Sequence, residues 1–347
     1  MNSSPAISVV VCSLNGARKI GACLEALADQ SVGDRMQLVV VDDGSSDGTA
    51  EVARRYTDEV HSHGINRGLS AARNTGIGLA RGPIIAFTDD DCIPEPTWLE
   101  QLLIAHETPG VIGAGGPVEI AGVRTIVHRY LAEYPPLAPL ELDLQRHSSF
   151  LGRLALYLAR TWFPSKQPVG PRAVYSFPGA NMSFKKRALE TVGGFNPKQK
   201  FGSDDEYICD RVRERFGLKA LWFEPGAVVR HNYEGTFSDV ARRNYAYGRG
   251  HAQAYLEDPG RRWPIVFPLP FVLIGMLWLL RRSPKGLLVP VAVPLAYPQG
   301  VTEWLTKGRM SDISFSWLRL IEEASHNVGM LAGLICSGQR PAGGRAS

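Results

Sequence analysis

The feature that most constrains the fold is a regular alternation of strand and helix signals between Ile7 and Gly113. Short β-branched or apolar runs at residues 7–12, 38–41 and 84–87 have the length of buried strands. Helical patterns separate them, such as the small-residue stretch at 69–80. Repeated strand–helix–strand units pair their strands in parallel through right-handed crossovers. The pattern therefore predicts an α/β fold with helices flanking a sheet.

Two of the predicted strands end in acidic residues, Asp42-Asp43 and Asp89-Asp90-Asp91. Ligands of such sheets bind outside the carboxyl ends of the strands, so these carboxylates share one crevice and require a compensating cation or donor groups. The D-x-D spacing puts Asp89 and Asp91 on one side of an extended backbone, where they suit Mg²⁺ or Mn²⁺. Asp90 points elsewhere or toward a sugar. The alternative is an acidic turn that caps the next helix.

Three further positions are candidates for chemistry. Asp204 and Asp205 begin a predicted helix, whose dipole keeps a carboxylate ionised as a general base; the alternative is simple N-terminal capping. Arg73 is expected to pair with Asp43 or a diphosphate, unless it is a surface arginine. His231 follows a predicted strand and is a metal ligand, a residue that orients a metal ligand, or a structural or surface histidine.

The C-terminal part changes character, with apolar segments at residues 265–280 and 286–297. Each is shorter than the ~20 residues that span a bilayer comfortably. They predict a re-entrant hairpin, two short spans or an interfacial anchor, and the alternative is a pair of buried core helices. The basic residues Arg281, Arg282 and Lys285 between them favour an anionic membrane surface. Helices are also predicted at 149–162 and 314–335, and disorder at 341–347.

Composition excludes several classes of protein. The net charge of +4 over 347 residues, without a basic stripe interleaved with aromatics, argues against a nucleic-acid partner. The 5 cysteines include no C-x-x-C pair, which argues against a disulfide framework or a zinc site. The N-terminus lacks the basic region of a signal peptide, so we expect a catalytic domain in the cytoplasm. Neither a Walker loop nor a G-x-S-x-G elbow is present.

Taken together, the motifs resemble the family 2 glycosyltransferases with the GT-A fold. The resemblance covers about residues 6–232 and is carried, in order, by SVVVCSLNG, VVVDDGSSDGT, NRGLSAARNTGIGLARG, IAFTDDDCIPEPTWL, PGANMSFKK with VGGF, and SDDEYICDR. It implies a Rossmann-like mixed sheet flanked by helices in a transferase domain over residues 1–235. A C-terminal helical, membrane-associated region over residues 236–340 is similar to that of membrane-attached members.

The resemblance also implies roles for individual residues. The nucleotide-sugar contacts would be Ser13, Asn15, Asp43, Arg73, Asp89, Asp90 and Asn181. The metal would be held by Asp91 and Asp89, with His231 as a further ligand. The family's Glu-Asp pair falls on Asp204 and Asp205, which makes Asp205 the base. This chain departs from the pattern with Asp204 in the first place, and a register shifted by one would make Asp204 the base and Glu206 the later acid.

The resulting hypothesis is an inverting transfer from a nucleoside-diphosphate sugar to a hydroxyl of a glycan or lipid-linked acceptor, assisted by Mg²⁺ or Mn²⁺. We expect this reaction in cell-envelope polysaccharide or glycolipid biosynthesis, at the cytoplasmic face of the inner or plasma membrane. One alternative is a sugar nucleotidyltransferase, although the N-terminus lacks a Gly-rich loop with Arg or Lys. The other is a non-catalytic, membrane-tethered scaffold.

Overall fold

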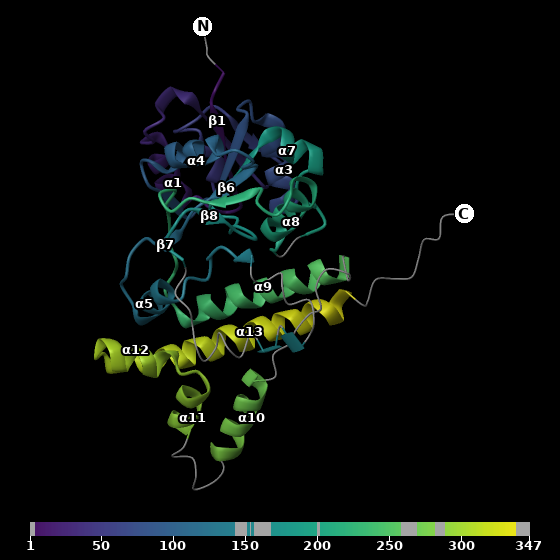
Figure 1. Ribbon diagram of the computed structural model, residues 1–347. Helices are drawn as coiled ribbons and strands as arrows, with labels where there is room; N and C mark the ends of the chain where they lie inside the picture. Colours follow the sequence, from purple (N-terminus) through teal and green to yellow (C-terminus); the bar gives the residue numbers. More distant parts are fainter. Residues whose placement is uncertain are drawn as a thin grey trace.

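The computed structural model describes residues 4–142, 151–152, 154–155, 168–199, 202–257, 269–281 and 289–337. Figure 1 shows two parts: a sheet covered by helices near the N-terminus, and a group of C-terminal helices below it. The long helices α9 (Phe237–Glu257) and α13 (Ser314–Ser337) run side by side between the sheet and the remaining C-terminal helices.

The main sheet has eight strands in the order β3-β2-β1-β4-β9-β6-β10-β8. The strands β3, β2, β1 and β4 are parallel, as the alternating pattern predicts. Strand β9 is antiparallel to both β4 and β6, which makes the sheet mixed. The bounds are β1 (Ile7–Ser13), β2 (Met36–Asp42), β3 (Val60–Ser62), β4 (Ile84–Asp89), β6 (Gly113–Gly115), β8 (Arg172–Ala173), β9 (Met182–Lys185) and β10 (Leu221–Phe223).

Helices cover both faces of this sheet, which explains why its central strands are continuously apolar. In β1, Val9 and Val11 join the core on the side of two helices, α1 (Ile20–Ala28) and α4 (Trp98–Glu107). Val10 points to the opposite core, formed with three other helices. These are α3 (Leu69–Leu79), α7 (Lys186–Val192) and α8 (Asp204–Phe216); a short α2 (Thr49–Ala53) follows β2.

A second sheet lies at the carboxyl ends of the parallel strands and has the order β5-β11-β7. Its strands are β5 (Cys92–Pro94), β7 (Val118–Ile120) and β11 (Val229–His231). His231 pairs with Cys92 in the ladder, so the second sheet brings β11 beside the acidic segment that follows β4. The helix α5 (Ile126–Glu133) comes after β7.

The C-terminal helices pack tightly on each other and on α5. A Cβ atom at Gly248 would lie 2.0 Å from the His326 carbonyl oxygen, so α9 and α13 approach as closely as their backbones allow. Tyr130 of α5 donates a 2.6 Å hydrogen bond to Glu322 of α13. Phe315 and Val240 share one apolar cluster with α5. The N-terminal part with the main sheet and the C-terminal helices therefore have a common core at α5.

The helices α10 (Leu269–Arg281) and α11 (Val289–Ala296) form the end of the molecule farthest from the main sheet (Figure 1). Leu273 and Val293 are buried against α13, but Trp278 is 54% exposed and Leu295 67%. This exposure contradicts the alternative of two buried core helices. A further helix, α12 (Gln299–Lys307), follows α11. Among the described residues, none of the helices has the combined length and apolarity that crossing a bilayer requires.

Several predictions fall largely on residues outside the described ranges. These are most of the helix at 149–162, the tail at 341–347, the beginnings of the apolar segments at 265–280 and 286–297, and the basic residues Arg282 and Lys285. The described part of 149–162, residues 151–152 and 154–155, is helical.

Candidate active site

The acidic segment after β4 forms the centre of the candidate site. Asp91 lies 3.3 Å from the Nε2 atom of His231, measured from its Oδ1 atom. One ligand atom each from Asp89, Asp91, Cys92 and His231 lies within 4.8 Å of the other three. The predicted metal ligands Asp89, Asp91 and His231 are thus brought together by the pairing of β11 with β5.

The chemistry of this cluster fits a hard divalent cation. Burial raises the pKa of Asp89 to about 6; the charge of Arg73 opposes this increase and those of Asp91 and Asp90 add to it, so a bound cation would relieve the repulsion among the three carboxylates. Burial lowers the pKa of His231, and a neutral imidazole can offer a lone pair to a metal. Burial raises the pKa of the Cys92 thiol well above its usual value, which makes this sulfur a poor ligand for Mg²⁺ or Mn²⁺. Two carboxylates and one imidazole therefore form the fitting donor set.

Asp90 faces the loop after β1 rather than the other two aspartates. It accepts a hydrogen bond from the Ser13 hydroxyl and lies 2.8 Å from the Lys19 ammonium group. Lys19 also lies 3.3 Å from Asp91, so one cation bridges two members of the acidic segment. The spacing of residues in the sequence does not reveal Lys19, because its contacts join segments that are about 70 positions apart.

Arg73 lies buried in α3 beneath the acidic segment. Its guanidinium group donates to the Asp204 carboxylate, lies 3.3 Å from Asp89 and donates to the Gly179 carbonyl oxygen at 3.2 Å. The prediction that Arg73 pairs with Asp43 is wrong, because the buried carboxylate of Asp204 and the 34% exposed carboxylate of Asp89 occupy its donors. Arg73 instead connects the acidic segment to the start of α8.

Asp43 organises the loop before α3. Its carboxylate lies 2.7 Å from the Nδ1 atom of His63 and accepts backbone hydrogen bonds from Arg67 and Gly68 at 3.0 and 2.8 Å. Asn15 adopts a positive φ of 52° and accepts a hydrogen bond from the Ser46 amide at 3.0 Å. These contacts hold the predicted nucleotide-binding loops together at the ends of β1 and β2.

Asp205 has a different environment from Asp204, its neighbour in the first turn of α8. The Asp205 carboxylate accepts backbone hydrogen bonds from Gly179 at 2.9 Å and Glu206 at 2.8 Å. Burial raises its pKa to about 7, and the charges of Asp204 and Glu206 add to this increase. The ion pair with Arg73 thus belongs to Asp204, which leaves Asp205 without an ion-pair partner among the described residues.

Asn181 is fully buried and its amide is engaged inside the protein. It accepts a hydrogen bond from Trp98 at 2.9 Å and donates to the carbonyl oxygens of Pro117 and Ala227 at 2.9 and 2.7 Å. The structure therefore does not place this side chain where it could contact a nucleotide sugar. The turn at residues 178–181 reaches the site through the Gly179 backbone instead.

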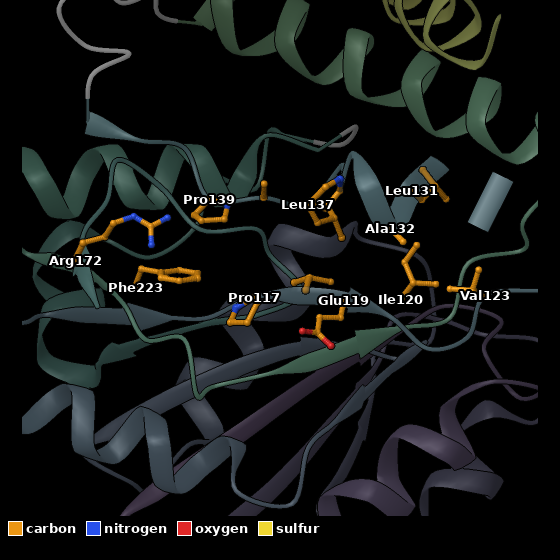
Figure 2. Close-up of a pocket in the computed structure, with 13 residues that line it drawn as sticks. Pro117, Glu119, Ile120, Val123, Leu131, Ala132, Leu137, Pro139, Arg172 and Phe223 are labelled. Carbon is orange, nitrogen blue, oxygen red and sulfur yellow. The ribbon is translucent and has the colours of Figure 1, made fainter. Parts of the chain in front are cut away.

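An apolar cavity of about 360 Å³ lies in the irregular region after β6. Figure 2 shows Arg172 and Phe223 at one end and Ile120 and Val123 toward the other. Ile120 pairs with His231 in the second sheet, so the cavity adjoins the acidic cluster. The sequence contains no recognisable signal for this cavity, because its lining comes from loops and short strands far apart in the chain.

Comparison with known proteins agrees with this geometry. Residues 8–193 match the family described as Glycosyl transferase family 2. Glycosyltransferase AglE of Haloferax volcanii is 39% identical over 279 residues, which cover 79% of this chain and 82% of the relative. The glucosyl-dolichyl phosphate glucuronosyltransferase of the same organism is 25% identical over 245 residues, covering 66% of this chain and 70% of that protein.

Among solved structures, a mannosyltransferase from Pyrobaculum calidifontis in complex with GDP-Man and Mn²⁺ superimposes with a TM-score of 0.55. Its sequence is 20% identical, and the match covers 96% of this chain and 88% of the other, which shows a shared GT-A fold. The match to the family and the acidic cluster together support the expected nucleotide-sugar donor and divalent cation. Because the match to this family covers more than half of the chain, the chain belongs to the family 2 glycosyltransferases.

Proposed function

We propose that this glycosyltransferase is an inverting enzyme that transfers a sugar from a nucleoside-diphosphate sugar to a hydroxyl group of a lipid-linked or glycan acceptor. The observation that carries the proposal is the contrast between Asp204 and Asp205. Arg73 neutralises Asp204, while Asp205, held by two backbone amides, keeps a carboxylate poised near neutral pH.

Asp205 is the general base in this proposal. A base works best when its pKa lies near the operating pH, and the pKa of Asp205 is about 7. It takes the proton from the acceptor hydroxyl, whose oxygen then attacks the anomeric carbon from the face opposite the leaving diphosphate. The shifted register, with Asp204 as base and Glu206 as acid, has less support because the Asp204 carboxylate is bound to Arg73.

The donor lies at the carboxyl ends of β1, β2 and β4. Asp89, Asp91 and His231 would hold the divalent cation, which when bound neutralises charge on the departing diphosphate. Asp43, Asn15 and Ser13 belong to the nucleotide side, since they fix the loops after β1 and β2. Lys19 holds Asp90 and Asp91 in place, and Arg73 does the same for Asp89.

Acceptor and location follow from the C-terminal region. The exposed apolar side chains of α10 and α11 include Trp278, a residue type enriched at membrane interfaces. One relative is a glucosyl-dolichyl phosphate glucuronosyltransferase, a protein named for a lipid-linked substrate. We therefore assign this chain to the cytoplasmic face of the plasma membrane, where it uses a lipid-linked acceptor in the synthesis of envelope glycans or glycolipids.

The experiment compares Asp205→Asn with Asp204→Asn in detergent-purified protein. A panel of UDP-, GDP-, dTDP- and CDP-sugars with Mn²⁺ first identifies the donor by its increase of Tm. We expect Asp205→Asn to lower turnover by about 10²–10⁴-fold with donor binding unchanged, because only proton transfer is lost. Asp204→Asn should lower Tm, because it removes the buried partner of Arg73.

Three results would contradict the proposal. Near-normal turnover of Asp205→Asn would contradict the assignment of Asp205 as the general base. Release of pyrophosphate from a nucleoside triphosphate and a sugar phosphate indicates a nucleotidyltransferase. Donor binding without release of nucleoside diphosphate, across a broad acceptor panel, indicates a scaffold.

A further inference from the structure

A group of buried polar atoms without hydrogen-bond partners lies beside the acidic cluster. Within the described part of the chain, these are Nδ1 of His231, the hydroxyl of Tyr233, and both terminal nitrogens of Arg243. The Nε atom of Arg243 donates to Asp239 at 3.0 Å, and the outer fork of the guanidinium group lies toward the Tyr247 hydroxyl. Buried polar groups are nearly always paired, so donors of this kind in three contacting side chains favour a bound group that accepts from them.

The unpaired groups are linked by ring contacts that start at the candidate metal site. The His231 ring, whose Nε2 faces Asp91, stacks on the Tyr233 ring with centroids 4.1 Å apart. The Arg243 guanidinium carbon lies 4.3 Å from the centroid of the same tyrosine ring. Arg243 therefore lies two ring contacts from the carboxylates that suit a divalent cation.

Tyr247 extends the group along α9. It is four residues after Arg243, so both side chains project from the same face of the helix. Burial raises the pKa of the Tyr247 hydroxyl to about 12; Arg243 opposes this effect, whereas Asp205 and Asp89 add to it. The hydroxyl thus remains a donor and lies within electrostatic reach of both the proposed base and the acidic segment.

We propose that Arg243, Tyr233 and Tyr247 form an anion site that binds a phosphate group of a substrate next to the acidic cluster. A guanidinium fork matches the geometry of phosphate oxygens, and the two phenol groups add neutral donors. The inference rests on the proposed function, which supplies two phosphate sources: the donor diphosphate and the phosphate of a lipid-linked acceptor.

The location of this site gives the C-terminal region a role in substrate binding. Arg243 and Tyr247 lie in α9, which follows the segment matched to the family at residues 8–193. The position of α9 depends on α13, because glycines at 248 and 329 let the two helices touch. The C-terminal region would therefore add Arg243 to the two cations, Lys19 and Arg73, that the transferase fold itself places at the acidic cluster.

The test compares Arg243→Met with Arg242→Met, a matched control on the neighbouring residue. Arg242 has a side chain that is 64% exposed, against 17% for Arg243, and it pairs with Glu234 at 2.9 Å and, at 3.1 Å, with Asp239, which Arg243 also binds. Calorimetry measures binding of the nucleoside diphosphate with Mn²⁺, the matching nucleoside monophosphate, farnesyl phosphate and farnesol. Thermal melting and circular dichroism confirm that each variant is folded.

We expect Arg243→Met to weaken one phosphate ligand by about ten- to a hundredfold, the usual effect of losing a charge-assisted hydrogen bond, and Arg242→Met to change no ligand by more than about twofold. Loss confined to the nucleoside diphosphate assigns the site to the donor. Loss for farnesyl phosphate, with farnesol unchanged, assigns it to the acceptor. If Arg243→Met fails to fold, Tyr247→Phe provides the same comparison, with an expected loss of about three- to tenfold.

Unchanged affinity of a folded Arg243→Met, or in its place Tyr247→Phe, for every phosphate ligand that the wild type binds would overturn the anion site. That result differs from failure of the proposed function, in which the wild type itself binds no nucleotide in the presence of Mn²⁺.

Discussion

Asp204 and Asp205 are adjacent and chemically identical, yet their surroundings give them different properties. Arg73 donates to Asp204, whereas Asp205 accepts only backbone amides. Burial and the neighbouring charges of Asp204 and Glu206 make Asp205 hold its proton to higher pH, and the charge of Arg73 opposes them only in part, which accounts for its pKa of about 7. Enzymes that need a base at neutral pH tune one carboxyl group in this way.

The pH dependence of the reaction should reflect the ionisation of the Asp205 carboxyl group. Because the base must be ionised, we expect kcat/KM to rise with pH along a limb with an apparent pKa near 7. The measurement is a profile of kcat/KM from about pH 5 to about pH 9 at saturating Mn²⁺. A profile that is flat through neutrality would contradict the assignment of Asp205.

The same pKa makes an independent prediction about folding. The folded protein keeps the Asp205 proton up to about pH 7, while the unfolded chain loses it near the ordinary value of 3.8. Since the folded state binds more protons in that window, this group lowers the free energy of unfolding as pH rises through it. Asp205→Asn should therefore be less sensitive to pH between these values, as measured by urea unfolding at several pH values, and an unaltered pH dependence would contradict the shift.

Two neighbours in the candidate metal cluster should respond differently to substitution. His231→Gln should weaken Mn²⁺ binding on the order of ten- to a hundredfold, because it removes an imidazole nitrogen next to Asp91. Cys92→Ala is the matched control in the same cluster and should leave the affinity unchanged, because the Cys92 thiol is held protonated by burial. Electron paramagnetic resonance of free Mn²⁺ measures both, and equal losses would contradict this choice of ligands.

The positions of single residues were predictable from the sequence where they follow from local spacing. Asp89 and Asp91 meet as D-x-D spacing requires, and Asp204 and Asp205 begin a helix. The partner of Arg73 and the internal engagement of Asn181 could not be predicted, because they depend on segments 131 and 83 positions away in the chain. A sequence pattern gives a residue's neighbours along the backbone but not its neighbours in the folded protein.

Among the secondary-structure elements, those with a long or fully buried pattern were predictable. Strands β1, β2 and β4 are apolar runs, and α3 and α13 begin at the predicted residues. The strands β5, β7 and β8 were missed because they are two or three residues long and lie directly after the acidic segment or in the irregular region after β6, without a continuous apolar run. Yet β5 and its partner β11 place His231 next to Asp91, so a short element controls the geometry of the site.

The contact between α9 and α13 depends on glycine, and substitution should reveal this. In Gly248→Ala the new Cβ would lie 2.0 Å from the backbone oxygen of His326, so the helices must separate. We expect a loss of about 1–3 kcal/mol in the free energy of unfolding. Gly275→Ala, in α10 with nothing within 4 Å of its Cβ, is the control and should be neutral or stabilising. Thermal melting measures both; equal Tm values for Gly248→Ala and wild type would contradict the close contact.

In the whole molecule, the C-terminal helices connect three features: the shared core, the catalytic centre and the exposed apolar end. The predicted boundary at residue 235 lies just before α9, and we retain it as a proposal for where the two parts of the chain meet. They are not independent, because the rings of Tyr130 and Phe315 meet edge to face across them with centroids 5.4 Å apart. The structure thus joins a transferase fold to α10 and α11 through α9 and α13.

The apolar end formed by α10 and α11 should bind membranes. Leu279 is 62% exposed there, and inserting its side chain into the interface removes apolar surface from water. We expect wild-type protein to sediment with anionic vesicles, more weakly at high salt because the adjoining segment Arg281-Arg282-Ser283-Pro284-Lys285 is basic. Leu279→Ser should weaken binding by about tenfold. Leu218→Ser, at a 57% exposed leucine just after α8, is the matched control and should bind as the wild type does. Equal loss in both variants, or no sedimentation of the wild type, would contradict membrane binding through this end of the molecule.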